Sequence, residues 1–244
     1  MKLWKSWTVT MKDFSVFKRK KYIIYSLIAM PLILGILLPG TLLLTVPSSQ
    51  IPVGVLTALL SAEGSIFIMM AGILPTVIAS YSFIGEKVEK SLEPLLATPT
   101  TDGELLLGKS LSAFIPSMAA TYLGSVIFMA LVDVLTYGYI GYILFPNLNM
   151  AVILGLVAPL ACILSVEFNV IISSRVNDVR AAQQLGSLII LPLVGIFILG
   201  ETNPTDISVI PMLIVAAVLI VADIALFFVS KAIFQREEIL TKWK

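Results

Sequence analysis

Six runs of apolar residues, separated by short polar segments, dominate the 244-residue chain. Each run approaches or exceeds the roughly 20 residues that a helix needs to cross the hydrocarbon core of a bilayer. We therefore predict an all-α polytopic membrane protein, a single domain with six transmembrane helices in residues 22–230 and a polar tail at 231–244. The runs cover roughly residues 22 to 46, 53 to 84, 105 to 134, 150 to 173, 181 to 200 and 208 to 230.

Residues 1–21 show a different pattern, in which apolar and charged positions recur at helical spacing. At about 100° per residue, large apolar side chains share one face of the helix and charged side chains the other. This pattern is typical of a helix that lies in the headgroup layer, and the basic residues 18–21 would anchor its end. The apolar face comprises Leu3, Trp4, Trp7, Met11, Phe14 and Phe17, and the charged face Lys2, Lys5, Lys12 and Asp13.

The segment 86–109, EKVEKSLEPLLATPTTDGELLLGK, is the only long polar stretch between apolar runs, and we call it the elbow. It leaves one predicted span and leads into the next, so it must turn at the membrane surface. Ser91 is a candidate N-cap for a short helix, and Pro94 fits the first turn, where the missing donor is not needed. Pro99 disfavours a helical conformation at Thr98 and ends that helix.

The second half of the elbow carries the signature of a helix start. Thr101 to Glu104 has the S/T-x-x-E form of a capping box, so a new helix is predicted to begin at Asp102 and to run into the third apolar run. The second and third runs are long, and we expect their inner ends to project beyond the lipid and to carry the elbow.

The elbow resembles the first cytosolic loop of the type-2 ABC exporter permeases, which reads roughly E-x-E-x-G-T-L-E-x-L-L-x-T-P, followed by E-L-L-x-G-K. Lys90 and Ser91 depart from this pattern, since the family usually has Gly-Thr there. The positions that agree are Glu86, Glu89, Leu92, Glu93, Leu95, Leu96, Thr98, Pro99, Glu104, Leu105, Leu106, Gly108 and Lys109.

The resemblance implies that the elbow carries a coupling helix that docks on a separate ABC ATP-binding subunit. It also implies that residues 1–21 are a connecting helix beside that region, and that the link at 173–184 faces the same ATPase. In the link, the arginines could equally act only as topology determinants. The implied coupling residues are Glu86, Glu89, Leu92, Glu93, Leu95, Leu96, Thr98, Pro99 and Glu104, and the candidates for a second cytosolic contact are Arg175, Asp178 and Arg180.

Composition excludes a soluble domain, because 58% of the residues are hydrophobic and only 13% are charged. The chain has no histidine, which excludes imidazole catalysis and histidine metal ligation, so no metal site is predicted. The single cysteine, Cys162, lies in an apolar run and is expected to be a packing residue. No two glycines have Gly-x-x-x-Gly spacing, and we therefore predict no close glycine-mediated helix crossing.

The stretch from Gly103 to Ser110 matches the P-loop pattern G-x-x-x-x-G-K-[ST]. A phosphate-binding loop needs a preceding strand and a flexible backbone that curls around the nucleotide. The capping box and the three consecutive leucines instead predict a helix here. We therefore expect this chain to bind no cofactor and not to be an enzyme, with ATP and Mg²⁺ bound by the partner subunit.

The distribution of basic residues predicts the orientation of the chain. All sixteen Lys and Arg residues lie before the first run, in the elbow, in the link at 173–184 or after the sixth run. The positive-inside rule then places both termini and the elbow in the cytosol of a multi-pass plasma-membrane protein. The outer segment 135–149 contains Tyr137, Tyr139, Tyr142 and Phe145, which predicts an aromatic belt at the outer interface, although a gate there stays an alternative.

Four acids fall inside the apolar runs and are candidates for an intramembrane pathway: Glu63, Asp133, Glu167 and Asp223. A carboxylate at depth costs about 2 to 3 kcal/mol on insertion scales, so each should face protein or water. Glu167 and Asp223 lie roughly 12 Å along a helix from the nearest basic residue, and protonated or water-bridged acids that hold helices together are the alternative. For Glu63 and Asp133 the alternative is proximity to the outer water.

These observations together predict a permease subunit of an ATP-driven exporter that moves a hydrophobic or amphipathic cargo, such as a lipid, drug or peptide. Its expected partners are the ATP-binding subunit, a second permease copy or paralogue, and the lipid bilayer, but not nucleic acid. Export of a small cation such as sodium is one alternative, which the unpaired acids would serve. A non-transporting membrane scaffold or assembly factor is another.

Overall fold

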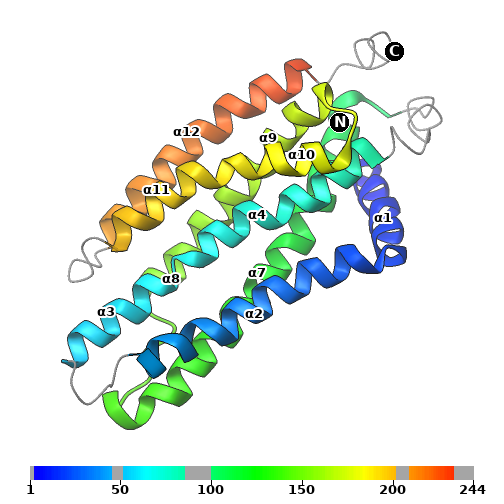
Figure 1. Ribbon diagram of the computed structural model, residues 1–244. Helices are drawn as coiled ribbons and strands as arrows, with labels where there is room; N and C mark the ends of the chain where they lie inside the picture. The colour runs from blue at the N-terminus through cyan, green and yellow to red at the C-terminus, as the bar shows by residue number, and fades with distance from the viewer. Residues whose placement is uncertain (1–2, 46–51, 86–99, 202–208, 234–244) are drawn as a thin grey trace.

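The computed structural model describes residues 3–45, 52–85, 100–201 and 209–233, which are helical apart from short turns and loops, with no strand among them (Figure 1). The elements in chain order are α1 (Leu3–Arg19), α2 (Lys21–Thr45), α3 (Val53–Glu63), α4 (Ile66–Ser80), the π-helical turn η2 (Tyr81–Gly85), α7 (Asp102–Ile140), α8 (Leu148–Val152), the π-helical turn η3 (Ile153–Val157), α9 (Ala158–Arg175), α10 (Val179–Gly186), the 3₁₀ turn η4 (Ser187–Ile189), α11 (Ile190–Glu201) and α12 (Val209–Ile233).

Within the described residues, five helical segments are long and apolar enough to span a membrane. The all-helical fold predicted from the apolar runs is thus confirmed, and the five segments indicate a membrane protein. The segments are Lys21–Thr41, Val53–Gly85, Asp102–Gly138, Leu148–Arg175 and Val209–Ser230.

The fifth predicted span, residues 181 to 200, corresponds to α10, η4 and α11, where the helix is interrupted by one 3₁₀ turn. Its described apolar part, Val179–Gly195, is shorter than the other five segments. A crossing by this segment therefore stays a prediction. In Figure 1, α10 and α11 run alongside α4 and antiparallel to it, along the axis of the bundle.

The bundle is organised around α4, which packs most extensively on α9 and also on α7. α2 lies along α7, and α12 lies along α9 on the other side (Figure 1). α1 instead crosses the end of the bundle at a steep angle to α2 and packs on α7. We call this end, where α7 begins and α9 and α12 finish, the α1 end.

Single glycines bring α2 and α7 into close contact, so the prediction of no close glycine-mediated crossing is wrong. A Cβ added at Gly124 of α7 would lie 2.7 Å from Cβ of Pro31 and 2.8 Å from its carbonyl oxygen in α2. A Cβ at Gly35 would lie 2.7 Å from the carbonyl oxygen of Gly124. The search for Gly-x-x-x-Gly missed this crossing because each helix contributes a single glycine, and Pro31 forms the neighbouring part of the contact.

At the far end, α7 stops at Ile140, and Gly141 adopts the left-handed conformation (φ 79°) that glycine tolerates without strain. Tyr137 and Tyr142 are exposed, as a belt requires. Phe145 is buried, with its ring 5.7 Å from that of Phe128, so its predicted place in the belt is wrong. The Phe145 ring, in the loop after α7, is therefore part of the hydrophobic core. Cys162 is buried in a small apolar cluster, as predicted.

Candidate functional site at the α1 end of the bundle

The predicted coupling residues from Glu86 to Pro99, including the expected short helix at 92–97, lie outside the described residues. The described part of the elbow starts at Thr100. Its flanks are η2 on one side and the start of α7 on the other, and both belong to the α1 end (Figure 1).

The capping box at the start of α7 is confirmed. The Glu104 backbone N–H donates to Thr101 Oγ1 at 3.3 Å, and the Thr101 N–H donates to Glu104 Oε2 at 3.1 Å. Glu104, predicted as a coupling residue, is buried, and its carboxylate is committed to this cap. The reciprocal bonds satisfy two amides that a helix start leaves open, and thereby fix where the elbow re-enters the bundle.

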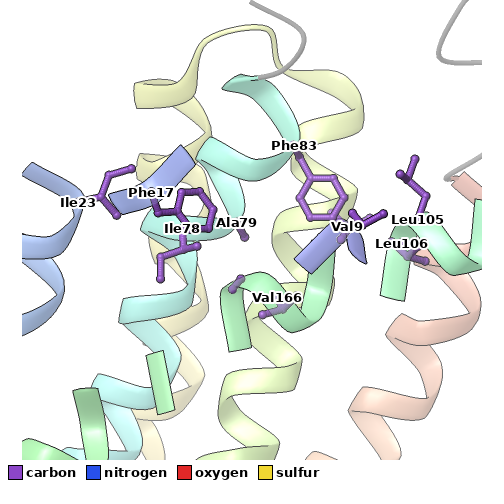
Figure 2. Packing of buried hydrophobic residues seen from close by; sticks show 11 residues of the cluster. Val9, Phe17, Ile23, Ile78, Ala79, Phe83, Leu105, Leu106 and Val166 are labelled. Carbon is purple, nitrogen blue, oxygen red and sulfur yellow. The ribbon is translucent and has the colours of Figure 1, made fainter. Parts of the chain in front are cut away.

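An apolar cluster packs α1 against the flanks of the elbow. Figure 2 shows Val9 of α1 beside Phe83 of η2, with Leu105 and Leu106 of α7 next to them. Gly108 allows α1 to approach this closely, because a Cβ there would lie 2.6 Å from the Ser6 carbonyl oxygen.

Beside the apolar cluster lies a buried polar group that we call the anchor cluster: Thr10, Asp13, Ser82, Lys109 and Ser112. Asp13 Oδ2 accepts from Ser82 Oγ at 2.6 Å and from Ser112 Oγ at 3.0 Å. Thr10 Oγ1 lies 2.9 Å from the Gly108 carbonyl oxygen, to which it donates. The cluster therefore ties α1 to η2 and to α7 through hydrogen bonds that are shielded from water.

Lys109 supplies the positive charge of the anchor cluster. Its Nζ donates to the Ser82 carbonyl and lies 5.3 Å from the centre of the Phe83 ring. Ser82 thus contacts the cation through its carbonyl and the Asp13 anion through its hydroxyl. Buried charges are tolerated when they are held in such a hydrogen-bonded arrangement, and breaking one side leaves a costly uncompensated charge.

The P-loop-like stretch is helical, as predicted, because Gly103 to Ser110 forms the first turns of α7. In a nucleotide site the lysine side chain of this pattern reaches phosphate. Here Lys109 is fully buried and bonded to Ser82, and Gly108 faces Ser6 and Val9 of α1. The residues of the P-loop-like stretch thus contribute to the packing of α7 against α1 and η2.

The two faces predicted for α1 are only partly those of the structure. Leu3, Trp4, Trp7 and Met11 are exposed, which leaves an apolar strip available to lipid. Phe17 of the predicted apolar face is buried instead, and so is Asp13 of the predicted charged face. The helical spacing identified the faces, but it did not reveal that the bundle covers one flank of the helix.

An open cavity of about 420 Å³ lies between α7, α9 and α12, close to the α1 end. Each helix contributes residues at helical spacing, so each presents one face. From α7 come Gly103, Leu106, Leu107, Ser110, Leu111 and Phe114; from α9 come Ile163, Val166, Glu167 and Val170; and from α12 come Phe227 and Ser230. Phe227 is 48% exposed and Ile163 is 36% exposed, so the cavity opens on the outer surface of the bundle.

Two of the four intramembrane acids lie on the helices that form this cavity. Glu167 lines it, half-buried, and its Oε2 is buried without a hydrogen-bond partner among the described residues. Asp223 is buried one helical turn from Phe227, and neither of its carboxylate oxygens has such a partner.

The other two acids lie apart from this cavity. Asp133 Oδ1 accepts from the backbone N–H groups of Leu144 and Phe145, at 2.9 and 3.0 Å, and so ties the loop at the far end to α7. Glu63 is the half-buried last residue of α3. Among the described residues, no group of three or more His, Cys, Asp or Glu side chains could hold a metal ion.

The candidates for a second contact, Arg175, Asp178 and Arg180, are all exposed at the α1 end. Asp178 is the N-cap of α10, since its Oδ1 accepts from the Arg180 N–H at 2.7 Å. Both arginine side chains are open to solvent beside the elbow flanks, where a partner could reach them.

Sequence reasoning missed that Ser82, Lys109, Ser112 and Asp13 form one unit. Each lies in a different local pattern, and only the crossing of α1 over α7 brings them together. The one available signal was Asp13, a lone acid in a helix otherwise rich in lysine. Neither a protein-family model nor a curated protein matches the chain.

Proposed function

We propose that this chain is the permease subunit of an ATP-driven exporter of the type-2 ABC class, which moves a hydrophobic or amphipathic molecule out of the cell. The observation that carries the proposal is the meeting, at one end of a bundle of apolar helices, of α1, both flanks of the elbow and the exposed link of Arg175 to Arg180. A soluble ATPase docked there would contact the elbow and the link at once.

The anchor cluster gives this arrangement a mechanical meaning. Lys109 and Ser112 belong to α7, and Ser82 belongs to η2, so the two flanks of the elbow are bonded to each other and to Asp13 of α1. A push on the elbow would therefore move α1, the end of α4 and the start of α7 together. α7 also lines the open cavity, so such a movement would change the cavity's shape.

The experiment is reconstitution with an ATP-binding-cassette subunit, and a gene for such a subunit next to the gene of this chain would identify the one to use. Leu95→Asp should weaken the complex by about 2 kcal/mol, roughly 30-fold in Kd, because it places a charge where an apolar anchor is proposed to dock. Leu95→Met is the matched control and should retain affinity. Unchanged binding and transport in Leu95→Asp would contradict the proposed coupling contact.

The same complex separates the proposal from its rivals. ATP turnover that rises with sodium and loses this response in Glu167→Gln or Asp223→Asn would make cation export the better account, because carboxylates replace a hydration shell better than amides do. Absence of any ATP-dependent movement of solutes with the subunit bound would favour a scaffold.

A further inference from the structure

The cavity between α7, α9 and α12 is large enough for a drug-sized molecule, since such sites usually measure about 300 to 1,000 Å³. Its walls are mostly apolar, from leucine, isoleucine, valine and phenylalanine side chains of three helices. It opens sideways through Ile163 and Phe227, close to the α1 end, rather than along the axis of the bundle. An occupant can therefore enter from the lipid without crossing the packed interior.

The polar part of the lining is acidic. Ser230 donates its hydroxyl to the Phe227 carbonyl of its own helix at 3.0 Å, so that donor is already used. Ser110 contributes a second hydroxyl, and Glu167 is the charged side chain of the lining, with its Oε2 buried and without a hydrogen-bond partner among the described residues. No basic side chain lines the cavity in the described part of the chain.

Asp223 adds to the negative character of this region. It lies on the same face of α12 as Phe227 and Ser230, at spacings of four and seven residues, and is 8% exposed. α12, which carries Asp223, packs along α9, which carries Glu167. The positively charged Lys109, near the start of α7, does not line the cavity, because its side chain is bonded to Ser82 in the anchor cluster.

We propose that this cavity binds lipophilic monocations, with the cationic centre against Glu167 and the apolar part between α7 and α9. Such a molecule matches both properties of the site, because its charge compensates the buried carboxylate and its apolar surface covers the leucine-rich wall. A neutral molecule would leave Glu167 uncompensated, and an anion would be repelled. A bare metal ion would leave the apolar walls unused and would find too few ligands among the described residues.

The inference names a substrate class for the proposed exporter and rests on that function for its role in transport, but binding can be tested on the chain alone. Tetraphenylphosphonium is the probe, and tetraphenylborate, with the same shape and the opposite charge, is its control. The purified chain is placed in phosphatidylcholine nanodiscs, and saturable binding is measured above that of empty nanodiscs. We expect the cation, but not the anion, to show saturable binding.

Two pairs of variants assign the binding to the cavity. Glu167→Gln should weaken tetraphenylphosphonium binding at least tenfold, whereas Glu167→Asp, which keeps the charge, should bind more tightly than Glu167→Gln. Leu107→Trp should abolish binding by filling the cavity. Leu123→Trp, on an exposed position of the same helix, should bind like the wild type. Circular dichroism and gel filtration establish that each variant is folded.

The inference is overturned if the cation and the anion saturate alike, or if folded Glu167→Gln and Leu107→Trp bind the cation as the wild type does. Either result would assign the cavity to lipid chains and Glu167 to a structural role. This outcome is separate from that of the proposed function. If the chain binds the cation but shows no ATP-driven transport with its partner, the binding site is supported and the exporter function is refuted. If the complex transports but Glu167→Gln binds the cation as the wild type does, the exporter function is supported and the proposed binding site is refuted.

Discussion

The contact of Gly108 with α1 makes a prediction whose sign is opposite to the usual effect of the substitution. Replacing a glycine inside a helix by alanine normally stabilises the helix by up to about 1 kcal/mol. In Gly108→Ala the new Cβ would lie 2.6 Å from the Ser6 carbonyl oxygen and 2.8 Å from the Val9 Cβ. Both atoms belong to, or lie next to, the α1 backbone, so no side-chain rotation can relieve the overlap.

The magnitude follows from three contributions. Restoring an ordinary separation of 3.4 Å requires α1 to move by about 0.8 Å, and overpacking of this kind typically costs about 1 to 3 kcal/mol. The same movement stretches the hydrogen bond from Thr10 to the Gly108 carbonyl, worth about 1 kcal/mol. The higher helix propensity of alanine offsets about 1 kcal/mol of this destabilisation. We therefore expect Gly108→Ala to lower the free energy of unfolding by about 1 to 3 kcal/mol.

The matched control is Gly138→Ala in the same helix, where a Cβ would meet nothing within 4 Å. It should be neutral or slightly stabilising, by a few tenths to about 1 kcal/mol. Unfolding of both variants in detergent measures the difference, and hydrogen exchange of α1 amides, faster only in Gly108→Ala, locates it. If the two variants shift stability in the same direction, and α1 exchange is unchanged, Gly108 does not seat α1.

Three further substitutions test other parts of the structure. Thr101→Ala should lower stability by about 1 kcal/mol and speed exchange in the first turn of α7, because it removes the cap; slower or equal exchange would contradict the capping role. Lys109→Met should lower the free energy of unfolding by about 1 to 3 kcal/mol, since the Ser82 carbonyl loses its buried donor, while the chain alone should show no ATP turnover with or without the change. Robust turnover that Lys109→Met abolishes would reverse our interpretation of the P-loop pattern. Asp223→Leu should raise the free energy of unfolding by about 1 to 3 kcal/mol, because it removes two buried oxygens without hydrogen-bond partners among the described residues. A lower free energy of unfolding would indicate a partner for this carboxylate.

Features fixed by a few neighbouring residues were predictable from the sequence. The start of α7 is an example: the Thr101 hydroxyl and the Glu104 carboxylate are three residues apart, and their bonds require nothing else. The apolar runs likewise identified five spanning segments, because a length of hydrophobic helix is sufficient to cross a bilayer. The cap of α10 is equally local, since Asp178 accepts from the backbone N–H of Arg180 two residues later.

Features that depend on the crossing of helices were not predictable from spacing. The burial of Asp13 requires hydroxyls from residues 69 and 99 positions away in the chain. The contact between Gly124 and Pro31 depends on the angle and register of two helices, which no short motif encodes. The cavity has the same origin: Glu167 was recognised as an unusual acid, but only the packing of α7, α9 and α12 places it on an open wall.

The burial of Asp13 also sets an order of events during synthesis. Its partner Ser112 is added 99 residues after Asp13, which at roughly 5 to 20 residues per second takes about 5 to 20 s. During that interval α1 has no buried site for its carboxylate, so the helix must wait at the water-exposed surface of the membrane while α2 and α4 insert. We expect α1 to dock only after the first turns of α7 have formed, as the last step in assembling this half of the bundle.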